Sequence, residues 1–271
     1  ELINDTSVDA AVQMWTFGTD ADITFDQIGG GNVSFEDVHT NEGDIALTAD
    51  DGDIFAVKVE AQGRGYNVFL GTTSEGDVFV DQVNAVDDTV AITSDGAIEE
   101  LGSDELVCDD GEGGNEGGSR IVISETAAGA DLVATHLVLQ ATDNIGTSDN
   151  AIETEVNESD LGADNASIYA RTTGDAGIIN LLNVSQSPSV DVTALTLGED
   201  ADIDFQQVNG SVLDLVQVIT QNGDVNVTAD GTVNAWMVAA LDGGLVNGVV
   251  DDAHSVSITT VDGWCDDCGW S

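Results

Sequence analysis

The feature that most constrains this sequence is a recurring phrase, in which a Gly-Asp pair opens a run of alternating apolar and polar residues. Residues 43–63 read GDIALTADDGDIFAVKVEAQG, where a second Gly-Asp pair follows the first after nine residues and opens another run. Strict alternation indicates a β-strand with one buried face, and Gly beside Asp is typical of a turn. The phrase therefore predicts a chain built by stacking similar strand-and-turn units.

The same alternation dominates much of the chain. It occurs at 21–28, 32–38, 44–50, 53–61, 67–73, 77–83 and 89–95. Asp-Gly turn pairs stand at 51–52, 95–96, 230–231, 242–243 and 262–263. No segment has the apolar spacing of about 3.6 residues that marks an amphipathic helix, so we expect almost no helix.

A long internal repeat relates the two ends of the sequence. Residues 12–50 align without gaps onto 192–230, with 17 identities in 39 positions. Replacements such as Ile45 by Val225 and Leu47 by Val227 keep the apolar face. The repeat indicates duplication of a strand-rich unit.

A shorter, degenerate period of about 20 to 26 residues runs inside the long one. We therefore predict an all-β fold, a parallel β-helix (β-solenoid) forming a single domain over 1–271. A corner insertion is predicted at 103–119 and a tail rich in Cys and Trp at 263–271. At each corner Gly would turn the chain, Asp would face water and the next apolar residue would point inward. The core is expected to contain Ile45, Val57, Val68 and Val78, as well as Trp15 and Trp236.

The phrases GDIALTADDGDI, GDVFVDQVNA, GDVNVTADGTV and ADITFDQI resemble the coils of filamentous-haemagglutinin-type adhesins and related giant bacterial or archaeal surface proteins. That resemblance implies a right-handed parallel β-helix, secretion, and a role in adhesion or in surface fibres. The secretion-domain features of that family are not evident in this sequence, and the acidity of this chain is extreme.

The charge of the chain restricts its partners. Asp and Glu number 52 against 4 Lys and Arg, which gives a formal net charge of −48. Nucleic acid is excluded as a partner, because phosphate binding needs many cationic side chains. Two carboxylates one strand spacing apart, about 4.8 Å, repel by roughly 0.9 kcal/mol even in water. A saline environment or bound Ca²⁺ would relieve that repulsion.

No cofactor is required by any motif, and Ca²⁺ is the one candidate ion. No EF-hand loop and no GGxGxD array is present, so the candidates are acidic clusters at turns. The predicted calcium ligands are Asp50, Asp51, Asp53, Asp109, Asp110 and Glu112. Water-exposed acidic corners are the alternative interpretation.

Three cysteines and seven sequons suggest an extracellular or cell-surface location. Cys265 and Cys268 are close enough to pair, or either could bridge to Cys108 or to a neighbouring subunit, and no second pair completes a zinc ribbon. N-glycosylation requires Asn-X-Ser/Thr. The candidate sites are Asn4, Asn32, Asn157, Asn165, Asn183, Asn209 and Asn226.

These features favour a non-catalytic structural protein, a self-associating fibre, sheath or adhesin segment. Its predicted partners are copies of itself and cell-surface glycans, and no run of 18 apolar residues predicts a membrane span. One alternative is a β-helix that binds or cleaves carbohydrate. A uronate lyase would need clustered Arg or Lys, whereas the cations of this chain are scattered, and the net charge would repel an anionic glycan. A second alternative is a tandem of calcium-binding β-sandwich modules.

Overall fold

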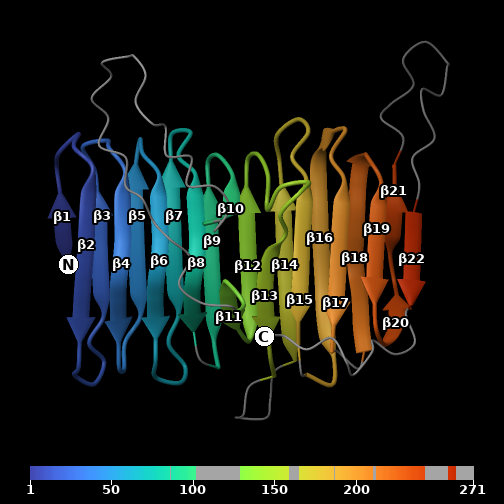
Figure 1. Cartoon of the computed structure of the whole chain (residues 1–271), viewed down its shortest axis with the longest axis horizontal. Helices are drawn as coiled ribbons and strands as arrows, with labels where there is room; N and C mark the ends of the chain where they lie inside the picture. Colours follow the sequence, from blue (N-terminus) through green and yellow to red (C-terminus); the bar gives the residue numbers. More distant parts are fainter. Residues whose placement is uncertain are drawn as a thin grey trace, which may run out of the picture.

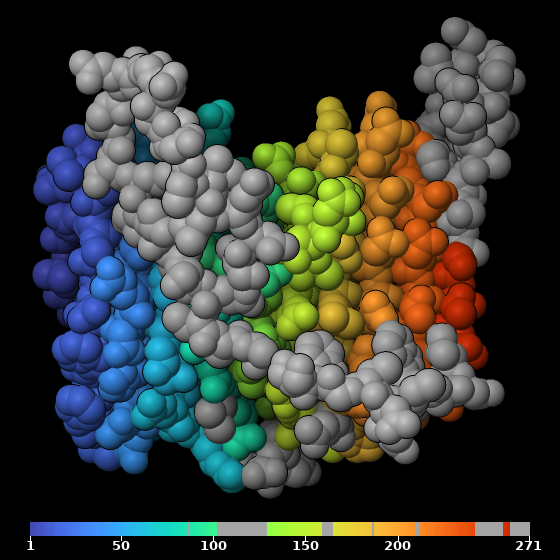
Figure 2. Space-filling view, viewed as in Figure 1, coloured from blue at the N-terminus to red at the C-terminus, as the bar shows by residue number. Residues whose placement is uncertain are grey.

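The computed structural model describes residues 1–85, 87–101, 129–158, 165–185, 187–209, 212–241 and 256–260. They form an all-β parallel solenoid of about nine turns, with no helix in the described residues. Successive coils stack along the long axis of the molecule (Figures 1 and 2). The predicted β-helix is confirmed, and the alternative of tandem β-sandwich modules is wrong, because every strand pairing among the described residues is parallel rather than antiparallel.

Two sheets of eleven strands face each other across the core. Sheet 1 runs in the order β1 (Leu2–Asn4), β3 (Ile23–Gln27), β5 (Ile45–Asp50), β7 (Val68–Thr73), β9 (Thr89–Ser94), β12 (His136–Ala141), β14 (Ala166–Thr172), β16 (Val190–Glu199), β18 (Val212–Asn222) and β20 (Thr232–Ala235), and β21 (Val238–Ala240) also pairs with β18. Sheet 2 runs in the order β2 (Ala10–Thr16), β4 (Val33–Thr40), β6 (Ile54–Ala61), β8 (Val78–Ala85), β11 (Leu132–Ala134), β13 (Ile152–Val156), β15 (Ile179–Val184), β17 (Ile203–Val208), β19 (Val225–Ala229) and β22 (Val256–Thr260), and β10 (Ile98–Glu100) also pairs with β8.

The coil length in sheet 1 is regular except at the two steps on either side of β12. In sheet 1 the inward residues Ile23, Ile45, Val68 and Val90 are successive partners, 22, 23 and 22 residues apart. The next step, to Leu137, spans 47 residues. This long step contains 102–128, so the predicted corner insertion at 103–119 lies outside the described residues.

Inward-facing Val, Ile, Leu, Phe and Ala side chains form one continuous core. Ile45, Val68 and Val78 belong to it, as predicted. Val57 does not, because β6 keeps Ala56 and Val59 inward and places both intervening residues on the outer face. The neighbouring strands β4 and β8 have the same extra residue in register, and it breaks the alternation on which the prediction rested.

The predicted burial of two tryptophans is also wrong. Trp15 is 47% exposed and Trp236 is 80% exposed. Trp15 lies on the outer face of β2, where its Nε1 donates to Asp37 Oδ2 at 3.1 Å. Both residues have apolar sequence neighbours, but each lies in one of the terminal coils, where the stack offers less surface to bury it.

Hydrogen bonds between coils hold the corners. Asp44 Oδ1 accepts from the amide of Asn67 at 2.8 Å, one coil later, and Asp22 Oδ1 accepts from the amide of Asp44 at 3.0 Å. The prediction that the corner Asp simply faces water is therefore incomplete. The carboxylate also satisfies a backbone donor that begins the next coil, where the strand ladder does not reach.

The long repeat reappears as matching corners on opposite sheets. The hydroxyls of Thr16 and Thr40 both donate to the carbonyl oxygen of Ala21, at 2.7 and 3.2 Å. The aligned residues Thr196 and Thr220 donate to Ala201 at 2.9 and 2.7 Å. The register shift after Val12 recurs after Val192. However, β2 lies in sheet 2 and β16 lies in sheet 1, so the repeat exchanges the two sheets.

Candidate functional site

The outer face of sheet 1 carries a strip without acidic side chains, which we call the acid-free strip. It consists of two columns of outward positions from β5 to β18, in register from coil to coil. One column is Ala46, Phe69, Ala91, Val138, Tyr169, Thr193 and Gln217. The other is Thr48, Gly71, Thr93, Gln140, Arg171, Leu195 and Ile219. Neighbours within a column are about 4.8 Å apart along the axis.

The strip is specific to sheet 1. The outer face of sheet 2 has acidic residues on most of its strands, and these include Asp37, Glu60, Glu99, Glu153, Glu155 and Asp204. Because 52 of the 271 residues are acidic, fourteen positions of average composition would include two or three acids, and this strip has none. The strip is thus a local surface with its own electrostatic character.

Arg171 is the one cation of the strip. Of the other described cations, Lys58 Nζ lies 3.5 Å from Glu60 and Arg64 Nε lies 3.0 Å from Asp87. Arg171 makes no ion pair within the described residues, although the chain has a large excess of carboxylates. Arg171 is half-buried on the outer face of β14.

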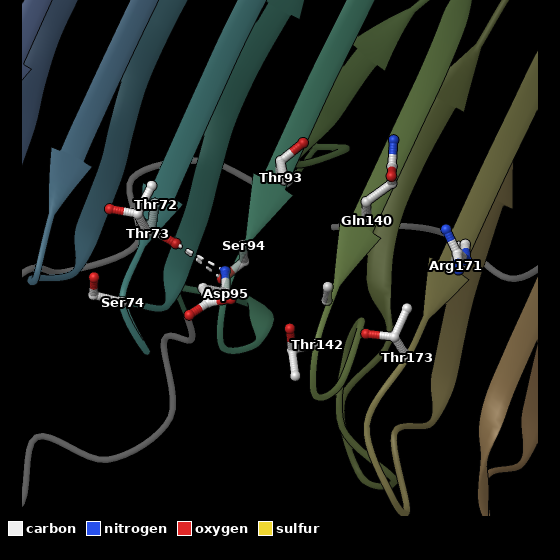
Figure 3. A pocket seen from close by; sticks show the side chains of 11 residues that line it. Thr72, Thr73, Ser74, Thr93, Ser94, Asp95, Gln140, Thr142, Arg171 and Thr173 are labelled. Carbon is white, nitrogen blue, oxygen red and sulfur yellow. Dashed lines mark hydrogen bonds between the residues drawn. The ribbon is translucent and has the colours of Figure 1, made fainter.

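The carboxyl ends of β7, β9, β12 and β14 surround a hollow of about 260 Å³ next to Arg171 (Figure 3). At its inner wall, the hydroxyls of Thr72 and Ser94 lie 3.2 Å apart, and both donate to the carbonyl oxygen of Gly76. Their hydrogens are therefore already bonded within the corner of the solenoid. Five further side chains in the wall make no hydrogen bond within the described residues and are free to donate. They are Thr93, Gln140, Thr142, Arg171 and Thr173.

Aromatic and aliphatic side chains extend the surface beside the hollow. Phe69 is 39% exposed, and its ring lies over Gly71, so close that a Cβ at that glycine would meet it at 2.9 Å. Val138 and Tyr169 follow in the same column on β12 and β14, both half-buried. The arrangement offers apolar contact beside a group of hydrogen-bond donors and one positive charge.

The predicted calcium ligands do not converge in the described residues. Asp50 accepts from the hydroxyl of Thr73 at 2.5 Å, and Asp53 accepts from the amide of Asp77 at 3.0 Å. Asp51 occupies the turn, with φ of 59°. No group of three His, Cys, Asp or Glu that could hold a metal ion occurs in the described part of the chain. Asp109, Asp110 and Glu112 lie outside it, and calcium binding stays a prediction.

The cysteine predictions fall on residues that the structure does not describe. Cys108, Cys265 and Cys268 all lie outside the described ranges. Their pairing, with one another or with a neighbouring subunit, stays a prediction.

The sequons differ in exposure. Asn165, Asn209 and Asn226 are exposed, and Asn4, Asn32 and Asn157 are half-buried. Asn183 is fully buried, where its Oδ1 accepts from the hydroxyl of Thr154 at 3.1 Å. A glycan on Asn183 is incompatible with this packing, because its attachment nitrogen lies inside the core. Glycosylation of the other six stays a prediction.

One buried acid has an unusual environment that the sequence did not reveal. Asp131 precedes β11, is 4% exposed and accepts from the amide of Glu153 at 2.8 Å. Burial raises the pKa of Asp131 to about 8, and the nearby carboxylates of Glu100, Glu153 and Asp81 add to the effect, against the bond from Glu153. This carboxyl is therefore mostly protonated at neutral pH.

Sequence reasoning missed the acid-free strip and its Arg171. A signal was present, since HLVLQA (136–141) and ASIYART (166–172) are alternating segments without an acid. That signal gains meaning only when the register places both segments side by side. Within the described residues, no helix is long and apolar enough to cross a membrane. No protein-family profile, curated protein or solved structure matches this chain.

Proposed function

We propose that the chain is a non-catalytic structural segment of an extracellular surface fibre, in which copies stack end to end through their terminal coils. The observation that carries the proposal is the pair of apolar surfaces at the two ends of the solenoid. A parallel strand at the end of a stack presents unpaired amides and carbonyls, which another β-edge can pair with.

The first coil exposes a large apolar surface. Leu2 and Ile3 on β1 are 51% and 53% exposed, and Phe17, directly after β2, is 73% exposed. Among the described strands, β1 pairs only with β3 and β2 pairs only with β4. Apolar residues of β2 that point toward the core, such as Met14, are only partly buried, because none of the described coils covers their other side.

The last described coil has a comparable surface. Trp236, Met237 and Leu241 are exposed beside β20 and β21. In the rest of the described chain, exposed apolar side chains are few and scattered, for example Phe69 and Leu197. The apolar surface that a soluble protein normally covers is thus concentrated at the two axial ends.

The charge of the chain favours contact between copies through the ends of the solenoid over contact through its sides. Most side surfaces carry carboxylates and repel one another, whereas head-to-tail stacking hides apolar surface and pairs free strand edges. Association is expected to strengthen with salt, as in the saline environment that the composition suggests.

Sedimentation velocity of the 271-residue chain from 5 to 200 μM, in 0.15 and 1 M NaCl and with and without reductant, tests the proposal. Concentration-dependent assembly is expected, and it should weaken in Ile3→Glu and Phe17→Glu. Phe69→Glu, which places the same charge on the side of the solenoid, is the matched control. A monomer under all conditions, or an equal loss in the control, would overturn end-to-end stacking, and electron microscopy of the native material would show whether fibres form.

A further inference from the structure

We infer that the acid-free strip of sheet 1 is a binding site for a carboxylated saccharide, whose carboxylate pairs with Arg171. The inference is independent of the end-to-end stacking proposed above, because it concerns the side of the solenoid. It gives the predicted glycan partner a location and a chemical class.

The unpaired guanidinium points to an anion. Carboxylates are the commonest side chains in this protein, and the two other described cations each have one. Arg171 instead has Gln140 on one neighbouring strand and Leu195 on the other. A planar guanidinium matches a carboxylate with two parallel hydrogen bonds, so an incoming carboxylate completes this site.

The surroundings of Arg171 point to a saccharide as the carrier of that anion. Thr93, Gln140, Thr142 and Thr173 line the hollow with hydroxyl and amide groups that make no other hydrogen bond in the described residues. Such groups both donate and accept, as the hydroxyls of a sugar do. Beside them Tyr169 supplies an amphipathic ring, one face of which suits the apolar side of a sugar.

A second copy of the chain fits the strip less well than a saccharide. The same strip on another copy brings no carboxylate to Arg171, because it contains none. The outer face of sheet 2 does carry carboxylates, but several of them, including Glu153 and Glu155, would face the apolar column of the strip without a cation. A single negative charge with neutral polar groups around it matches the site better.

Long-range repulsion does not forbid such a ligand. The net charge of −48 opposes any anion at a distance, as the sequence predicts, but at physiological ionic strength this field decays over about 8 Å. Within that range the ligand meets the strip, where the two outward columns carry no acid from β5 to β18. Among the described residues, Asp95 is the one acid that lines the hollow, and its carboxylate accepts from the amide of Glu75 at 2.9 Å.

Titration calorimetry with tetragalacturonate and with its methyl ester tests the inference. The two ligands share their ring hydroxyls and differ in charge. A chelator is present throughout, so that no divalent cation bridges the ligand to protein carboxylates. The charged ligand is expected to bind, with the ester at least about tenfold weaker.

Variants then locate the site. Arg171→Gln should lose at least about tenfold in affinity for tetragalacturonate, and Tyr169→Ala should also weaken it. Arg64→Gln, which removes the same charge from a guanidinium paired with Asp87, is the matched control and should bind like the parent. Circular dichroism checks that each variant folds.

Four results would overturn the inference. They are no binding of tetragalacturonate, equal binding of the ester, an equal loss in Arg64→Gln, and lateral dimers in sedimentation that Tyr169→Ala abolishes. The last would assign the strip to a second copy. None of these outcomes bears on the stacking of the terminal coils, which is read from Ile3→Glu and Phe17→Glu.

Discussion

Thr220 donates its hydroxyl hydrogen to the carbonyl oxygen of Ala201 at 2.7 Å, across nineteen residues of sequence. The two residues belong to adjacent coils, and Thr196 donates to the same oxygen at 2.9 Å from the other coil. The carbonyl of Ala201 lies at a corner, outside the hydrogen-bond ladder of the strands. The two hydroxyls therefore supply the hydrogen bonds that a backbone amide of a neighbouring strand supplies elsewhere. Thr220 therefore fastens one coil to the next, and Thr196 holds the corner within its own coil.

Replacing these threonines tests the corner. Thr196→Val or Thr220→Val should each lower the free energy of unfolding by about 1 kcal/mol, because the carbonyl keeps one donor. The double variant should lose more than the two single losses together, since a buried carbonyl then has neither hydroxyl. Urea unfolding of the four proteins measures the coupling. Thr228→Val, on the outer face of β19, should change little, and strictly additive losses would contradict a shared acceptor.

Gly223 tests how closely the coils approach at a corner. A Cβ added there would lie 2.4 Å from the carbonyl oxygen of Ala201, on the backbone of the previous coil. Gly223→Ala should therefore lower the free energy of unfolding by more than about 2 kcal/mol.

The matched control is Gly18→Ala, where the nearest atom would be the Cβ of Ala21 at 3.5 Å, an ordinary contact. Its change in stability should stay within about 0.5 kcal/mol. If both alanine variants unfold at the same urea concentration, close approach at Gly223 does not constrain the stack.

Alternation, turn chemistry and the coil period predicted the architecture because they are local signals. Period-two runs fix which side chains share a face, and Gly-Asp pairs fix where the chain turns. The alternation failed at Val57, because two residues rather than one separate the inward positions of β4, β6 and β8, and the local pattern does not mark this change. It also failed at Trp15, whose burial depends on whether a coil lies beyond β2 rather than on its neighbours in sequence.

The candidate site could not be predicted from the sequence for a different reason. Arg171 and Gln140 are 31 residues apart, and they become neighbours only through the register of β12 and β14. The steps on either side of β12 are the two longest in sheet 1, so a regular period could not supply that register. The sheet exchange of the long repeat also follows from these steps, because β10 and β11 are successive strands in the same sheet.

Asp131 makes stability depend on pH in a direction opposite to that of a salt-bridged acid. Its pKa is about 8 in the folded chain and about 4 when unfolded, so between these values the folded state binds more protons. The contribution of Asp131 to the free energy of unfolding is therefore complete below about pH 4. It falls by at most about 1.4 kcal/mol per pH unit as the pH rises toward 8.

Asp131→Asn keeps an oxygen that can accept the amide of Glu153 and removes the ionisable group. The variant should be more stable than the parent at pH 8, and its urea midpoint should vary less between pH 5 and 8. Thermal and urea unfolding across this range provide the measurement. A parent whose stability is flat over the range, or a variant with the same slope, would show that Asp131 ionises freely in the fold.

Salt should stabilise the solenoid, because Asp22 and Asp44 occupy equivalent corners of adjacent coils. Two such carboxylates repel by roughly 0.9 kcal/mol at 4.8 Å in water, and 1 M salt shortens the screening length to about 3 Å. The urea midpoint should therefore rise between 0.05 and 1 M NaCl.

Asp44→Asn separates charge screening from a general effect of salt on apolar burial. The amide oxygen of Asn keeps the bond to the next coil, as Asn32 already does when it accepts from the amide of Asp53 at 3.0 Å. We expect the variant to be more stable than the parent by about 0.5 kcal/mol at 0.05 M NaCl and equal to it at 1 M. If the difference between the two proteins is the same at both salt concentrations, the stabilisation does not arise from repulsion between the stacked carboxylates, and the acidic corners are electrostatically independent of one another.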